Sequence, residues 1–155
     1  MRVFIVLSVP IFAALLMNCG PAAAPPAETV HRDPTAEPWY GRAVSELAGM
    51  NTEANALFQH GKKDAAAALI VKGEPLRDRL LGVTNPTLGA MEAASDLDQL
   101  YGQMLLSNHN YGWARLMFQK NVARWRFWKP QTPETESRLK RAQDEIAECD
   151  RKMSQ

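Results

Sequence analysis

Apolar and polar positions alternate with the period of an α-helix through most of the chain. From about residue 37 onward, Ala, Leu and Met recur three and four positions apart among charged residues, and the Val, Ile, Thr and Tyr alternation typical of strands is missing. The pattern predicts five helices, at about residues 37–60, 62–81, 87–107, 111–128 and 132–152. Short connections between them predict antiparallel neighbours and an all-α domain.

The residues at the predicted helix ends support these boundaries. Gly61 is typical of a helix C-terminus, and Asn108-His109-Asn110 is typical of a tight turn, because these residues tolerate unusual backbone angles. Thr132 is a suitable N-cap for the fifth helix. Gly73-Glu74-Pro75 lies within the second helix and predicts a kink or a break there.

The first 18 residues have a different composition from the rest. Arg2 is followed by an apolar run, residues 3–17, that is too short for a comfortable transmembrane helix, which needs about 20 residues. Pro10 weakens it further as a permanent span. One positive charge, a short apolar core and a processing site predict a secretory signal peptide at residues 1–18.

The end of this segment resembles the lipobox of bacterial lipoproteins, because Cys19 follows three positions after Leu16. In that family the cysteine thiol receives a diacylglyceryl group and becomes the new N-terminus. The resemblance implies lipidation of Cys19, export, and attachment to a membrane of the cell envelope. Residues 19–38 are then a Pro/Ala-rich tether, and residues 39–155 the helical domain. Cleavage within Ala22-Ala23-Ala24, which would release a soluble protein, and an uncleaved anchor are the alternatives.

Charge and cysteine content limit the function further. Arg2 is the one charged residue of the predicted signal peptide, so the remaining chain carries equal numbers of basic and acidic residues. A neutral, exported chain is not expected to bind nucleic acid. If Cys19 is lipidated, Cys149 has no partner for a disulfide, so stability must come from packing. We expect Cys149 to be a partly buried helix residue.

A weak internal repeat lies in the helical part. Ala54, Ala66 and Ile70 have the same spacing as Gly102, Ala114 and Phe118, and a turn residue, Gly61 or His109, follows seven positions after the first member of each set. Over about residues 44–130 this pattern resembles the tetratricopeptide helix pair, in which small residues let two helices approach closely. The resemblance implies stacked helix pairs; a generic helical bundle is the alternative.

The fourth predicted helix combines aromatic and basic residues. Ala114, Phe118, Val122 and Trp125 share one face, which we expect to be core, and we expect Phe118 and Trp125 to be buried. Trp113 and the basic residues project elsewhere, and no acidic residue lies between Asp98 and Glu134. The segment is either a core helix with solvated arginines or a binding surface. For the second case we predict contact through Arg124, Arg126, Trp128 and Lys129.

The remaining polar residues do not indicate a reaction. His60 and His109 fall at predicted turns without metal-ligand spacing, and Glu92, Asp96 and Asp98 are expected to be solvated or to pair with arginines of the fourth helix. None of the usual catalytic or nucleotide-binding motifs is found in the sequence, so we expect no enzyme activity, cofactor or metal.

These observations favour an interaction protein. A lipid anchor followed by a helix-pair domain suits an adaptor that binds another envelope protein on a concave surface. A non-catalytic glycan- or lipid-binding module that uses residues 113–129 is the alternative.

Overall fold

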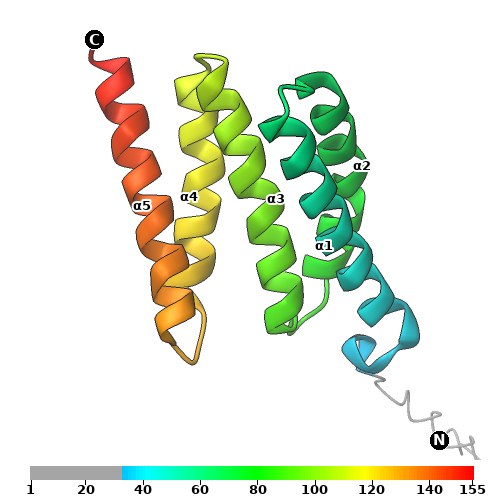
Figure 1. Cartoon of the computed structure of the whole chain (residues 1–155). Coiled ribbons are helices and arrows are strands. Elements are labelled where there is room, and N and C mark those ends of the chain that lie inside the picture. Colours follow the sequence, from blue (N-terminus) through cyan, green and yellow to red (C-terminus); the bar gives the residue numbers. More distant parts are fainter. Residues whose placement is uncertain (1–32) are drawn as a thin grey trace, which may run out of the picture. The chain divides into compact units, whose positions relative to one another are not determined.

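The computed structural model describes residues 33–155, which form one all-α unit (Figure 1). The predicted signal peptide, Cys19 and the start of the predicted tether lie outside the described residues. A short 3-10 helix, η1, is followed by five α-helices. The ends of these five helices lie within one residue of the predicted ends. Their bounds are η1 Pro34–Ala36, α1 Pro38–Gln59, α2 Lys63–Leu81, α3 Leu88–Ser107, α4 Tyr111–Phe127 and α5 Pro133–Met153.

Local chemistry explains where the helices begin and end. The side chain of Thr87 accepts a hydrogen bond from the Ala90 backbone N–H at the start of α3. Thr132 and Thr135 form a capping box at the start of α5, and Pro133 occupies the first turn, where its missing N–H costs nothing. After α4, the side chain of Gln131 donates to the free carbonyl of Trp125 at 2.8 Å.

Helices α1 and α2 pack as an antiparallel pair, and so do α3 and α4. Helix α3 also packs against both α1 and α2, whereas α5 packs mainly against α4. A large apolar cluster joins α1, α2 and α3, and includes Tyr40, Leu47, Ile70 and Leu97. A smaller cluster under α4 and α5 contains Phe118 and is closed by Leu105, Leu106 and Ile146. Successive helix pairs of this kind are consistent with a helical repeat.

The small residues of the internal repeat lie where helices meet. All six repeat residues are buried: Ala54, Ala66, Ile70, Gly102, Ala114 and Phe118. Gly61 and His109, the turn residues of the two copies, both have positive φ, at 74° and 61°. The turn prediction for residues 108–110 is therefore confirmed, and the two helix pairs reverse direction through the same kind of turn. Phe118 and Trp125 are both fully buried, as expected.

Two local expectations need correction. Of the kink or break predicted near Gly73-Glu74-Pro75, the break is wrong, because α2 continues through Pro75 to Leu81. Gly73 instead serves a close helix contact, since a Cβ atom there would lie 3.2 Å from Leu47 and 3.3 Å from Leu97. The last residues assigned to the tether are also structured: they include η1, whose N-cap Asp33 accepts from the Thr35 backbone N–H, and the start of α1.

Candidate binding groove

The four residues predicted to form a contact surface lie in different environments. Arg126 and Lys129 are exposed, and Trp128 is half-buried. The side chain of Arg124 is only 8% exposed, because it is paired with Asp98 of the preceding helix. The expected exposure of Arg124 is therefore wrong, and this arginine belongs to the interior.

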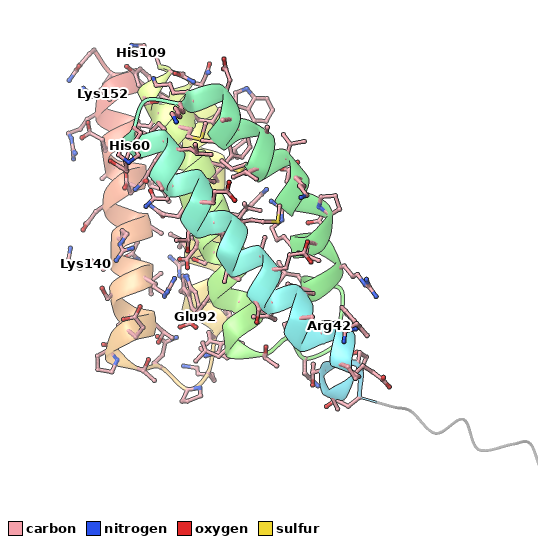
Figure 2. All side chains as sticks on the ribbon, turned by 45° about the vertical axis from the view of Figure 1, so that its right-hand side comes forward. Arg42, His60, Glu92, His109, Lys140 and Lys152 are labelled. Carbon is pink, nitrogen blue, oxygen red and sulfur yellow. The ribbon has the colours of Figure 1, made fainter. Side chains whose placement is uncertain are left out.

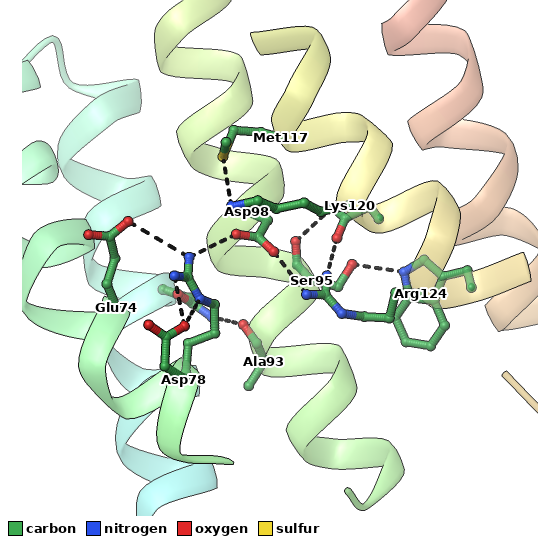
Figure 3. A network of polar contacts seen from close by, with 12 residues as sticks. Glu74, Asp78, Ala93, Ser95, Asp98, Met117, Lys120 and Arg124 are labelled. Carbon is green, nitrogen blue, oxygen red and sulfur yellow. Dashed lines mark hydrogen bonds and ion pairs between the residues drawn. The ribbon is translucent and has the colours of Figure 1, made fainter. Parts of the chain in front are cut away.

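Arg124 is part of a buried ionic network centred on Asp98 (Figure 3). Asp98 is 1% exposed and holds two arginines from different helices: its Oδ1 is 3.0 Å from Nη1 of Arg77 on α2, and its Oδ2 is 2.9 Å from Nη2 of Arg124 on α4. The expectation that an acid of the third helix pairs with an arginine of the fourth is confirmed. Because one carboxylate joins α2, α3 and α4, the network fixes how the two helix pairs meet.

Further polar contacts complete the network. Arg124 also donates to the side chain of Asn121, which in turn donates to the backbone carbonyl of Ser95 at 3.0 Å. The Ser95 hydroxyl accepts from the indole N–H of Trp125 at 2.8 Å. Burial of Arg77 lowers its pKa, but the neighbouring carboxylates, above all Asp98, outweigh this and raise it. These charges serve packing and are not available to a ligand.

A groove of about 540 Å³ runs between α1, α3 and α5. Neither α2 nor α4 contributes to it. Its lining is mostly uncharged and polar, from three helices: Ala48, Asn51, Thr52, Asn55 and Gln59 of α1, Asp96, Gln99, Leu100 and Gln103 of α3, and Arg141 of α5. Amide side chains offer both donors and acceptors, so such a lining suits a ligand with peptide-like groups.

Asn51 has an unusual position at the base of this groove. The residue is 7% exposed, and its Nδ2 donates to the Ala93 carbonyl at 2.7 Å, which ties α1 to α3. Its Oδ1 is the one buried side-chain polar atom in residues 33–155 without a hydrogen-bond partner. A buried acceptor without a donor is costly, and this one belongs to a residue that lines the groove.

Two acids at or beside the groove are held by bonds within the fold. Asp96 accepts from Arg138 at 2.6 Å, and Glu145 accepts from Gln99 and Gln103 at 3.2 and 3.4 Å. These bonds hold α5 against α3. Within the described residues no ion pair involves Arg141, which is exposed and also borders a shallow depression on α5. The groove therefore carries one cation at its α5 side.

His60 and His109 occupy turns, as expected from the sequence. His60 follows α1 and donates its backbone N–H to the Ala56 carbonyl, and His109 lies between α3 and α4. Both are at the same end of the helices (Figure 2). No three His, Cys, Asp or Glu side chains are grouped to hold a metal ion within residues 33–155.

Cys149 is more buried than expected, at 0% exposed, and it packs in the cluster with Phe118. Burial raises the pKa of its thiol, and the carboxylates of Glu145, Asp150 and Glu148 raise it further. Because the thiolate is the reactive form, the fraction able to react at mildly alkaline pH is reduced.

We therefore expect iodoacetamide at pH 8 to alkylate Cys149 at least about tenfold more slowly in the native protein than in urea. Mass spectrometry of the tryptic peptide 142–151 measures this directly. Equal rates in the two states would contradict a sealed site around Cys149. The alkylation rate of the native protein should also begin to rise at a higher pH than the rate of an exposed thiol, because the pKa of Cys149 is raised.

Comparisons with family models, with curated proteins and with solved structures gave no match to this chain. None of the helices in residues 33–155 is long and apolar enough to cross a membrane. By its fold, the described part of the chain is an all-α bundle of helix pairs, and a polar groove is lined by three of its helices.

Proposed function

We propose that this chain is an exported lipoprotein, anchored through Cys19, whose helical domain binds an extended segment of another envelope protein. The binding site in this proposal is the groove between α1, α3 and α5. The stacked pairs would then be tetratricopeptide-like, in line with the repeat around Ala54 and Gly102. The anchor rests on the sequence pattern at Leu16 and Cys19.

The observation that carries the proposal is the groove itself, which is lined by amide side chains of α1 and α3. An extended peptide presents backbone N–H groups that are free to donate, because they are not used in secondary structure. The lining amides Asn55 and Gln103 can bond to other backbone groups of the same segment. Arg141 favours an acidic side chain on the partner.

The settings of two tryptophans argue against an enclosed site for a single glycan or lipid molecule in segment 113–129. Trp125 is sealed in the core, and Trp113 is 64% exposed. Small-molecule sites are typically concave and largely bury their ligand.

Site-specific photocrosslinking in cells tests the groove. A photoreactive residue at Thr52, in the groove, should capture a defined partner, whereas one at Ala147, exposed on α5 outside it, should not. Arg141→Glu should weaken that capture about tenfold, since it reverses the charge facing an acidic group. Lys140→Glu, the adjacent exposed position outside the groove, is the matched control. Equal capture at both positions, or no effect of Arg141→Glu, would contradict the groove as the binding site.

A further inference from the structure

Helix α4 presents an apolar stripe to solvent. In the described residues six large apolar side chains are exposed, and three of them lie on this helix: Trp113 at 64%, Leu116 at 45% and Phe127 at 77%. Their spacing places them on one face, opposite the buried Ala114, Phe118 and Trp125. The stripe faces away from α3 and α5, against which the other side of α4 packs.

The same face is positively charged. Lys120 lies within the stripe, and Arg126 and Lys129 lie beside its C-terminal end; all three are exposed. The sequence has no acidic residue from 99 to 133, and the nearby Asp150 of α5 is already paired with Arg115 at 2.8 Å. Exposed Trp, Leu and Phe combined with Lys and Arg match the chemistry of a surface that lies on anionic phospholipid.

We propose that the outer face of α4, formed by Trp113, Leu116, Lys120, Arg126, Phe127 and Lys129, rests on the surface of an anionic membrane. This inference rests on the proposed lipid anchor, which keeps the helical domain near the membrane. It adds which face of the domain is turned toward the lipid. The 14 peptide bonds from Cys19 to Asp33 span at most roughly 50 Å when fully extended, so an anchored domain stays within reach of the bilayer.

A second copy of this chain is a poorer occupant of the face. Two such surfaces would bring Lys120, Arg126 and Lys129 of both copies together without acids to neutralise them. The membrane arrangement also leaves the groove free for a partner, because α4 contributes no residue to its lining. Membrane contact and partner binding can therefore occur together.

Fluorescence quenching in vesicles tests the proposal. The full chain, purified from membranes, is reconstituted into phosphatidylcholine vesicles with and without phosphatidylglycerol, all carrying brominated acyl chains that quench tryptophan. Quenching should be several-fold stronger in the anionic vesicles and weaken with salt. All chains carry Trp39→Phe and Trp128→Phe, because these two tryptophans are only partly buried. In this background Trp113→Phe should remove the lipid-dependent part, because the remaining Trp125 is fully buried.

Matched variants identify the face. Leu116→Ser with Phe127→Ser, or Lys120→Glu with Arg126→Glu, should reduce the quenching of Trp113 several-fold, whereas Val71→Ser, which removes an equally exposed apolar side chain from α2, should not. Quenching that is the same in neutral and anionic vesicles, or unchanged in Trp113→Phe, would overturn the proposal. The proposal would also be overturned if analytical sedimentation showed a dimer in which Trp113 is shielded from lipid.

Vesicle flotation separates this inference from the anchor. An anchored chain floats with neutral vesicles whatever its α4 sequence, and a chain that does not float contradicts the lipid anchor. Without an anchor, flotation with anionic vesicles measures membrane binding by α4 alone. Loss of flotation in the Lys120→Glu/Arg126→Glu variant then supports the membrane face, whereas no flotation of the unsubstituted chain rejects it.

Discussion

Asp98→Ala should destabilise the protein by about 3–5 kcal/mol, because it leaves Arg124 without its counter-charge and removes the buried carboxylate that pairs with Arg77. Arg77 and Arg124 have side chains 11% and 8% exposed, and Asp98 binds one with each carboxylate oxygen. Arg77 keeps Asp78 at 2.9 Å, whereas Asp98 is the carboxylate that pairs with Arg124. Urea denaturation followed by circular dichroism measures the loss.

Asp96→Ala is the matched control for this prediction. Asp96 precedes Asp98 on the same helix by two residues and also pairs with an arginine, Arg138, but its side chain is 47% exposed. Exposed pairs contribute about 0–1 kcal/mol, so this variant should change stability little. If Asp98→Ala costs no more than Asp96→Ala, the network is not the structural element described above.

A second comparison separates loss of charge pairing from loss of packing. Replacing Asp98 with Leu and both arginines with Met removes all three charges and keeps apolar volume. Such replacements of buried ion networks are often neutral or stabilising by about 1–4 kcal/mol. The triple variant should therefore recover most of the stability that Asp98→Ala loses.

The helices could be predicted from the sequence because their signals are local. Periodicity located each helix, and Gly61, residues 108–110 and Thr132 marked their ends. The second helix shows the limit of such signals. Gly73 and Pro75 indicated a break, but Gly73 is required by the contact with Leu47 and Leu97, which lie on other helices. A residue that tolerates a break and one that permits close packing look alike in sequence.

The candidate sites could be predicted only in part, because burial of a polar residue depends on its neighbours in space. For Asp98 the sequence left two possibilities, a solvated position or a pair with an arginine of the fourth helix, and the structure shows the pair. Nothing local distinguished Arg124, whose side chain is only 8% exposed, from Arg126, which is exposed. The groove was not predicted, since Asn51, Gln103 and Arg141 come from three helices whose packing the sequence does not state.

The second large effect is expected where Gly102 of α3 meets Phe118 of α4. Gly102 on α3 faces the ring of Phe118 on α4, and a Cβ atom at Gly102 would lie 2.5 Å from Phe118 Cε1 and 2.8 Å from Cζ. Phe118 is fully buried, so its ring cannot move aside without displacing α4. Gly102→Ala should therefore destabilise the protein by about 1–3 kcal/mol through overpacking. Phe118→Ala should cost about 3–5 kcal/mol by leaving a cavity.

Gly112→Ala on α4 should have the opposite sign, because a Cβ atom there meets nothing within 4 Å and alanine favours a helix by up to about 1 kcal/mol. Combining Gly102→Ala with Phe118→Leu should cost less than the sum of the two single changes, since the smaller side chain makes room for the methyl group. Strict additivity, or a gain in stability from Gly102→Ala, would show that the contact between Gly102 and Phe118 is looser than these distances indicate.

The first repeat shows the same relation between the sizes of two residues: Ala54 stands in place of Gly102, and the smaller Ile70 stands in place of Phe118. The size of one side chain thus limits its counterpart in both helix pairs.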